Sequence, residues 1–260
     1  MTLKVFITGA STGIGEALAV YYAGQGATLG LAARRAEFLD ALNQRLGGTH
    51  ATFALDVRDA PALRAAAAEF IARFGAPDIV IANAGVSAGT LTEHAEDLEV
   101  FRQIMDTNVF GMAATFAPFI PALRAAGGEP GKMRRLVGIA SVAGIRGLPG
   151  AEAYSASKAA AITYLESLRL EMLPYGIKVV TIAPGYIETP MTAVNSYKMP
   201  FLLPPEEAAK RFARAIERGV SYTVIPWQMG VVAKLLRILP DWLYDRLFVK
   251  APRKPRIRLP

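Results

Sequence analysis

The chain has 260 residues, of which 52% are hydrophobic and 20% charged; this is enough apolar material for one large α/β domain and excludes a disordered protein. It has no cysteine and two histidines, which excludes disulfides and thiol chemistry and argues against a multi-histidine metal site or a Ser-His-Asp hydrolase, so we predict no metal. The net charge of +7 suggests an anionic partner. Five of the basic residues lie within residues 250–260.

Short apolar runs alternate with segments of helical periodicity along residues 3–225. Strands are predicted at residues 3–7, 27–33, 51–55, 78–82, 136–140, 178–183 and 222–225. Helices are predicted at residues 14–23, 36–46, 61–74, 98–124, 151–173 and 206–218. The strands are continuous apolar runs, which is typical of a parallel sheet covered on both faces. The alternation predicts an α/β fold with a doubly wound sheet flanked by helices.

Residues 226–260 form an apolar and basic helical extension beyond the predicted domain of residues 1–225. The run 227–239 is nearly all apolar, Asp241 restarts a helix, and both tryptophans, Trp227 and Trp242, lie here beside basic residues. This combination is typical of a helix at a membrane interface, and 13 residues are too few to span a bilayer. We predict peripheral membrane contact with the basic tail on anionic headgroups. A helix pair that covers the domain or forms a subunit interface, followed by a frayed tail, is an equal alternative.

The amino terminus lacks the apolar core of a signal peptide, and no uncharged run is long enough to span a membrane. We therefore expect a cytoplasmic protein, with any membrane association at the inner face.

The first predicted strand ends in a glycine-rich turn, Thr8-Gly9-Ala10-Ser11-Thr12-Gly13-Ile14-Gly15. Glycines allow the backbone to turn sharply and approach a pyrophosphate, and the following helix directs free N–H groups and its positive dipole end toward the phosphates. The pattern indicates a dinucleotide site. A glycine-rich turn without a ligand is the alternative.

The ends of the second and third strands carry residues that would distinguish the cofactor. The second ends in Arg34 and Arg35, where an acid would bind the ribose hydroxyls of NAD, and guanidinium groups suit a 2′-phosphate, so we predict NADP(H). The alternative is a solvated arginine pair. Asp56 follows the third strand, where it would meet an adenine amine or cap the next helix.

Tyr154 and Lys158 lie four residues apart on a predicted helix, which puts their side chains on one face. A nearby ammonium favours tyrosinate and lowers a phenol pKa from about 10 toward neutrality. Tyr154 would then serve as a general acid or base near pH 7.

Together these residues resemble the short-chain dehydrogenase/reductase family in its single-domain, NADP-preferring form. The resemblance covers roughly residues 3–225 and implies a Rossmann-type sheet of about seven parallel strands with NADP(H) across their carboxyl ends. It rests on the glycine turn, Asn83-Ala84-Gly85, Asn108, Ser141, Tyr154, Lys158 and Pro184-Gly185. The cofactor-binding residues that it implies are Gly9, Ser11, Thr12, Gly13, Ile14, Gly15, Arg34, Arg35, Asp56, Val57, Asn83, Ala84, Gly85, Tyr154, Lys158, Pro184, Gly185, Ile187 and Thr189.

The resemblance also implies catalytic roles for four residues. Tyr154 would protonate the carbonyl oxygen while nicotinamide delivers hydride to carbon, Lys158 would lower the Tyr154 pKa and hold the ribose, and Ser141 would orient the substrate oxygen. Asn108 would sit at a helix irregularity and anchor a water of the proton relay. For Ser141 and Asn108 the alternative is a local structural hydrogen bond.

The expected substrate is a small apolar carbonyl or alcohol compound, because the loop of residues 186–204, which closes over the substrate in the family, is rich in Met, Phe and Leu. An equal alternative is that these side chains only pack the loop on the domain. We expect an NADPH-dependent carbonyl reductase acting on a lipid, a steroid-like compound or a 3-oxoacyl compound, in a homodimer or homotetramer. One rival is a non-catalytic NADP-sensing regulator or scaffold on the same fold. Another is a nucleic-acid-binding protein, which only the net charge supports, so we predict no nucleic acid.

Overall fold

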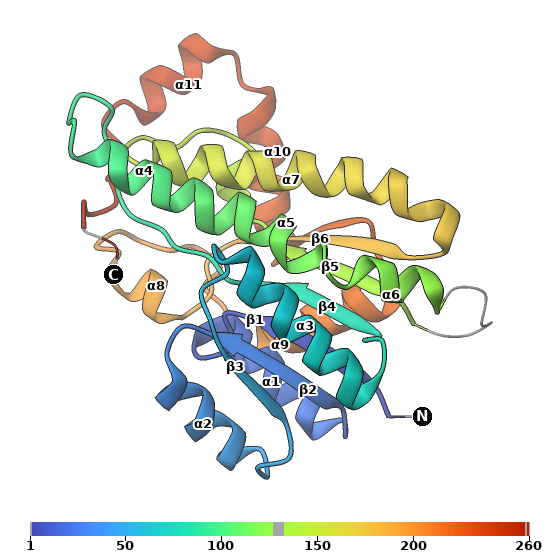
Figure 1. The fold of residues 1–260 in the computed structure, drawn as a ribbon. Helices are drawn as coiled ribbons and strands as arrows, with labels where there is room; N and C mark the ends of the chain where they lie inside the picture. Colours follow the sequence, from blue (N-terminus) through green and yellow to red (C-terminus); the bar gives the residue numbers. More distant parts are fainter. Residues whose placement is uncertain (1, 127–132, 258, 260) are drawn as a thin grey trace.

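The computed structural model describes residues 2–126, 133–257 and 259 (Figure 1). Within these residues, seven strands form one parallel sheet in the order β3-β2-β1-β4-β5-β6-β7. They are β1 (Lys4–Thr8), β2 (Thr28–Ala33), β3 (Ala51–Ala54), β4 (Ile79–Ala82), β5 (Arg135–Ile139), β6 (Lys178–Pro184) and β7 (Tyr222–Ile225). The predicted doubly wound Rossmann-type sheet is confirmed. The strand order reverses between β1 and β4, and ligands of such sheets bind at that point.

Helices cover both faces of the sheet, because alternate side chains of each buried strand point to opposite sides. In β1, Val5 and Ile7 pack with α1 (Gly13–Gly24), α2 (Ala36–Arg45) and α9 (Pro205–Arg218). Phe6 points the other way, toward α3 (Ala60–Phe74), α5 (Gly111–Phe116) and α7 (Glu152–Met172). Its ring lies 5.6 Å from that of Phe70 and 4.7 Å from that of Phe119, between ring centres. These two apolar layers hold the carboxyl ends of the strands at one edge.

The long helix predicted over residues 98–124 is wrong as a single element. The segment consists of α4 (Asp97–Met105), a π-helical turn η1 (Asp106–Phe110), α5, and α6 (Ile120–Ala125). Pro118 lacks the N–H that would continue α5, which accounts for the second break. The π turn widens the helix by one residue and places Asn108 in the interior, where it is fully buried.

The extension after β7 packs on the same body as the rest of the chain. It contains α10 (Trp227–Ile238) and α11 (Asp241–Phe248). Arg146 donates to the main-chain oxygens of Leu236 and Leu239 and forms a 2.8 Å ion pair with Asp241. These bonds satisfy carbonyls at the carboxyl end of α10 and fix the junction with α11. The remaining short elements are α8 (Pro190–Ala193) and two 3₁₀ turns, η2 (Val142–Gly144) and η3 (Leu173–Tyr175).

The carboxyl-terminal tail folds back onto the domain. Pro255 accepts a hydrogen bond from the N–H of Gly89 at 2.9 Å, and Arg256 pairs with Glu96 and Asp97. The frayed tail considered from the sequence is therefore wrong for residues 251–257 and 259. In the part of the chain that the structure describes, no helix is both long and apolar enough to cross a membrane.

Candidate active site

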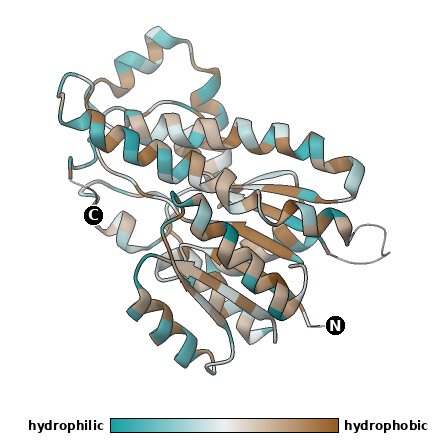
Figure 2. Ribbon diagram, in the orientation of Figure 1, coloured by the Kyte–Doolittle hydropathy of each residue, from teal (hydrophilic) through white to brown (hydrophobic). Residues whose placement is uncertain are grey.

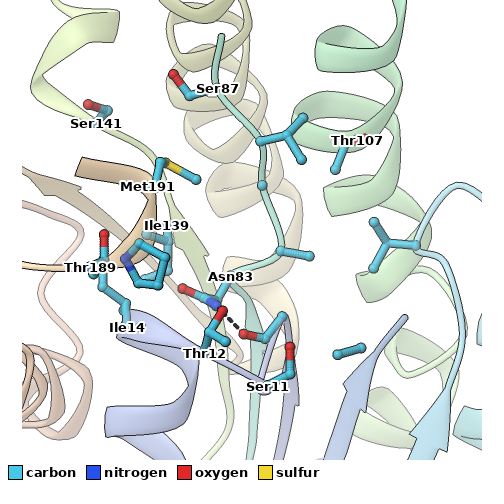
Figure 3. Close-up of a pocket in the computed structure, with 18 of the residues that line it drawn as sticks. Ser11, Thr12, Ile14, Asn83, Ser87, Thr107, Ile139, Ser141, Thr189 and Met191 are labelled. Atoms are coloured by element: carbon cyan, nitrogen blue, oxygen red, sulfur yellow. Dashed lines mark hydrogen bonds between the residues drawn. The ribbon is translucent and has the colours of Figure 1, made fainter. Parts of the chain in front are cut away.

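A cavity of about 780 Å³ opens at the carboxyl edge of the sheet. Its lining draws on the segments that follow β1 to β6, and Figure 3 shows Ser11 and Thr12 near Asn83, with Ser87 and Ser141 at the other end of the view. The residues expected from the sequence that line it are Gly9, Ser11, Thr12, Gly13, Ile14, Arg34, Arg35, Asp56, Val57, Asn83, Ala84, Gly85, Ser141, Tyr154, Lys158, Pro184, Gly185, Ile187 and Thr189. Gly15 and Asn108 lie behind this surface. The chain thus brings residues from six strand ends to one site.

The turn after β1 fits a pyrophosphate. Gly9 and Gly13 have positive φ angles of 66° and 62°, which other residues rarely adopt. Thr12 precedes α1 without capping it through its side chain, so the first N–H groups of the helix are free to meet an anion. A Cβ at Gly15 would lie 2.6 Å from Nδ2 of Asn83, so the absence of a side chain there lets α1 approach β4 closely.

Asn83 holds this turn in shape. Its Nδ2 donates to the main-chain oxygens of Thr8 at 3.0 Å and Gly9 at 3.2 Å. The amide therefore ties the end of β4 to the end of β1 across the strand-order reversal. Asn83 lines the cavity while its amide group supports the phosphate turn.

The opposite wall, after β2 and β3, carries the arginines. The guanidinium of Arg35 stacks over the Phe38 ring at 4.0 Å, and Arg34 lies close enough to Asp56 to favour its ionised form. Burial opposes ionisation of Asp56, but hydrogen bonds from Arg58 outweigh it and lower the pKa of Asp56. The helix-cap interpretation of Asp56 is wrong, because Asp59 caps α3 by accepting from the N–H of Ala62 at 2.9 Å. A basic wall of this kind fits the 2′-phosphate of NADP(H).

Ser141, Tyr154 and Lys158 meet at the other end of the cavity. The Ser141 hydroxyl lies close enough to Tyr154 to favour its ionised form, and Nζ of Lys158 lies 5.8 Å from the centre of the Tyr154 ring. Lys158 is buried, and its Nζ donates to the main-chain oxygen of Ile139 at 2.9 Å. Ser141 also accepts from the N–H of Ala143 at 3.1 Å, so the local bond considered from the sequence exists beside the contact with Tyr154.

The expected lowering of the Tyr154 pKa is not found in this structure. Burial raises the pKa of Tyr154, and the nearby Ser141 hydroxyl acts in the other direction. Burial also lowers the pKa of Lys158 to about 8, since the ammonium has no carboxylate partner among the described residues. The phenol therefore stays protonated at neutral pH, which suits a proton donor.

Asn108 joins three elements of the site from inside the π turn. Its Oδ1 accepts from the N–H of Val86 at 2.8 Å, and its Nδ2 donates to the Val86 oxygen and to Oγ of Ser157, both at 3.0 Å. A Cβ on Gly85 would lie 3.1 Å from that Oδ1 and 3.5 Å from Nζ of Lys158. Asn108 thus fixes the loop after β4 against α7, and a purely local helix bond is the wrong interpretation of it.

Thr189 and the residues around it form the floor of the predicted lid. Thr189 begins α8 and forms a reciprocal capping box with Thr192. Ile187 is buried in the core and pairs with Leu203, which anchors both ends of the loop. Met191 lines the cavity, and Phe201 and Leu202 are exposed. The loop is therefore held at its ends while its apolar side chains remain accessible.

The cavity also has lining residues outside the expected set, of which Ser87, Thr107 and Leu259 had no recognisable signal in the sequence, whereas Met191 belongs to the predicted lid. Ser87, Thr107 and Met191 belong to loops or helix faces near the predicted motifs. Leu259 comes from the carboxyl-terminal tail, far along the chain from the predicted motifs, and packs against the buried cluster of Ala88, Val100, Ile104 and Ala153. No group of three or more potential metal ligands gathers among residues 2–126, 133–257 and 259.

Fold and site together define a dinucleotide-binding oxidoreductase of the Rossmann type. A family model described as short chain dehydrogenase matches residues 3–199, and the chain belongs to this family. It is 39% identical over 244 residues, 92% of this chain and 93% of the relative, to an uncharacterized oxidoreductase of Myxococcus xanthus (strain DK1622).

Two further proteins with named activities are similar to this chain. An 11-beta-hydroxysteroid dehydrogenase-like protein 2 of Arabidopsis thaliana is 35% identical over 259 residues, which cover 94% of this chain and 81% of that protein. The solved 3-ketoacyl-(acyl-carrier-protein) reductase from Brucella melitensis, complexed with NADH, has a TM-score of 0.78 and 26% identity, covering 86% of this chain and 96% of that one. The relatives thus include oxidoreductases with different named substrates.

Proposed function

We propose that the chain is an NADPH-dependent carbonyl reductase that reduces an apolar ketone or aldehyde to an alcohol. The observation that carries the proposal is one cavity with Arg34 and Arg35 on one wall and Ser141, Tyr154 and Lys158 at the other end. The first wall suits a phosphorylated dinucleotide, and the second end offers a proton donor beside a hydrogen-bonding hydroxyl.

In the proposed reaction the bound reduced nicotinamide supplies hydride to the carbonyl carbon. Ser141 donates a hydrogen bond that orients the carbonyl oxygen, and Tyr154 transfers its phenolic proton to that oxygen as the C=O double bond becomes a C–O single bond. Lys158 stabilises the tyrosinate that forms, until a proton from solvent restores the phenol. Hydride and proton together balance the two-electron reduction to the alcohol.

Asn108 supports this chemistry as a positioning residue. Its bonds to Val86 and Ser157 hold the loop after β4 and helix α7 in register, and α7 carries both Tyr154 and Lys158. In the family the corresponding side chain also anchors a water of the proton relay, and we extend that role to Asn108.

The preference for NADPH rests on charge. Arg34 and Arg35 follow β2, where an acidic residue would accept hydrogen bonds from an unphosphorylated ribose. Both line the cavity, and the stacking of Arg35 on Phe38 limits the freedom that its guanidinium would lose on binding. The relative solved in complex with NADH is a protein of this fold that binds the unphosphorylated cofactor, so these arginines are the feature to test.

An apolar substrate is supported by the composition of the cavity. Val86, Met191 and Leu259 contribute apolar side chains near Ser141 and Tyr154. Steroid-like and 3-oxoacyl compounds share this requirement and agree with the names of the two relatives described above.

The test is a panel of ketones and aldehydes of increasing apolar length, each offered with NADPH and with NADH, with the alcohol identified by mass spectrometry. We expect alcohol formation with NADPH and a kcat/KM at least tenfold lower with NADH. Tight NADPH binding without turnover of any carbonyl would favour the non-catalytic sensor instead.

We also propose that α10 and α11 contact an anionic lipid surface. Trp227, Val231, Leu235 and Ile238 follow each other at helical spacing on α10 and are 48–75% exposed, and Trp242 on α11 is 69% exposed. Hydrophobic and hydrophilic residues alternate along α11 (Figure 2), and the exposed cations Lys234, Arg237 and Arg246 flank the apolar residues. This pattern suits a helix that lies in the headgroup region.

Vesicle flotation tests this contact. We expect the full chain to float with phosphatidylserine-containing vesicles and the Trp227→Gln/Trp242→Gln double variant to remain in solution. Failure of the wild-type chain to float, together with a dimer that the double variant converts to a monomer, would assign the surface to a second copy of the chain.

A further inference from the structure

The carboxyl-terminal tail, residues 251–257 and 259, lies across the substrate side of the active site; we refer to it as the strap. The strap packs directly against Gly89 and Gly150. The N–H of Gly89 donates to the Pro255 oxygen at 2.9 Å, and a Cβ on Gly150 would lie 2.8 Å from the Arg253 side chain. The strap therefore occupies a defined path.

An ion-pair cluster holds the strap in this path. Nε and Nη2 of Arg256 donate to the two oxygens of Asp97 at 2.8 and 3.1 Å, and Nη2 also reaches Glu96 at 2.9 Å. Asp97 is 6% exposed, and among the described residues its other hydrogen-bond donor is the N–H of Leu91. The hydrogen bonds from Arg256 lower the pKa of Asp97, so the carboxylate and the guanidinium remain charged together at neutral pH. A buried carboxylate that depends on a residue of the strap makes this attachment specific.

The strap delivers Lys254 to the reacting end of the cavity. Its Nζ donates to Oγ of Ser87 at 2.7 Å and lies 5.6 Å from the centre of the Tyr154 ring. Lys158 lies 5.8 Å from the same ring centre. Ser87 itself lines the cavity, so the Lys254 ammonium sits at the cavity edge close to the proposed proton donor.

No carboxylate among the described residues pairs with Lys254. Its ammonium has three donors, and the structure assigns one of them a partner, Ser87. Burial lowers the pKa of Lys254 to about 8. An ammonium that is largely removed from water without a counter-charge is costly in free energy, and such groups concentrate where they serve a ligand. The proposed reaction uses Lys158 and leaves Lys254 without a role.

We infer that Lys254 is a substrate-recognition residue, which selects ketones that carry a second oxygen acceptor next to the reacting carbonyl, such as oxo esters and oxo thioesters. The inference rests on the proposed reductase function. With the reacting oxygen at Tyr154 and Ser141, a second carbonyl oxygen on the same small molecule lies within reach of the free N–H groups of Lys254. Arg256 is then a positioning residue, because it keeps the strap and Lys254 in place.

The test compares two ketones of equal chain length with NADPH at pH 7: ethyl butyrylacetate, a β-keto ester, and propyl pentyl ketone. The readout is the ratio of their kcat/KM values, because intrinsic reactivity affects the ratio equally in every variant. Lys254→Met should lower this ratio at least about tenfold through loss of the ester substrate alone, the effect of one charge-assisted hydrogen bond. Lys254→Arg should retain most of it.

Two further variants separate recognition from folding. Arg256→Gln should lower the ratio as Lys254→Met does, and Arg218→Gln, which removes an exposed cation at the end of α9, should leave it unchanged. The melting temperature of Lys254→Met should not fall, since the substitution removes a buried charge.

Three outcomes would overturn the inference or its basis. A ratio of kcat/KM values that is unchanged in Lys254→Met, whether neither ketone is affected or both lose equally, would mean that Lys254 does not recognise the second oxygen. An equal loss with a shifted pH profile would make Lys254 an electrostatic partner of Tyr154. Absence of NADPH oxidation by the wild-type chain with either ketone would contradict the proposed function itself.

Discussion

Replacement of Arg34 or Arg35 by alanine should remove most of the preference of the chain for NADPH over NADH. Both side chains line the wall of the cavity after β2, and Arg35 is held by its 4.0 Å stack on Phe38. A hydrogen bond from a charged donor contributes about 1.5–3 kcal/mol, and 1.4 kcal/mol corresponds to a factor of ten. Each single variant should therefore lose about 10–100-fold in kcat/KM for NADPH.

The assay is steady-state oxidation of NADPH and of NADH at a fixed, saturating ketone concentration. The values for NADH should change by less than about threefold, because that cofactor has no phosphate at this position. Arg64→Ala on α3 is the matched control, since it removes one exposed arginine away from the cavity. Equal losses with both cofactors, or a wild-type preference for NADH, would refute the reasoning about this wall.

Three other predictions follow from burial. The kcat/KM for reduction should fall as the pH rises through about 8, because Lys158 loses its proton there before the phenol does. Lys158→Arg should shift this fall in kcat/KM to higher pH, and a fall at an unchanged pH would assign the titration to another group. Phe70→Ala should lower the free energy of unfolding in urea by about 3–5 kcal/mol and exposed Phe110→Ala by under about 1 kcal/mol, and equal effects would contradict the described core. Arg146→Ala should speed amide hydrogen exchange in α10 and α11 at least about tenfold, and unchanged exchange would mean that its carbonyl bonds do not anchor the extension.

The sheet and the position of the cofactor site could be predicted because their signals are local. Each strand is a continuous apolar run, and the glycine turn, Asn83 and the Tyr154 and Lys158 pair follow strand ends or share a helix face. Parallel strands bring their carboxyl ends to one edge, so residues at strand ends meet without further information. The sequence therefore predicts which residues meet at the site, whereas the hydrogen bonds between them depend on packing.

The features that periodicity and charge patterns do not predict depend on contacts between distant segments. The irregularity at Asn108 is expected from the family resemblance alone, because the burial of Asn108 against Val86 and Ser157 leaves no trace in the periodicity of residues 98–124. The basic tail suggested solvent or lipid headgroups, yet Arg256 pairs with Asp97 and Lys254 lies beside Tyr154. Charge counting along the chain cannot locate a partner 159 positions away.

The Tyr154 pKa shows a second limit of sequence reasoning. The four-residue spacing to Lys158 suggested a lowered pKa, but spacing carries no information on burial. In the folded chain, burial of both groups raises the pKa of Tyr154 and lowers that of Lys158. The tyrosine is thereby kept as an acid, which agrees with reduction as the proposed direction.

The most direct test of the central claim is the rate of ketone reduction by Tyr154→Phe, measured together with NADPH binding by fluorescence titration. Loss of the phenolic proton should lower kcat by about 10²–10⁴-fold, while the Kd for NADPH stays within about threefold of the wild-type value, since the ring remains. A variant that retains wild-type kcat would contradict Tyr154 as the proton donor and with it the proposed reductase mechanism.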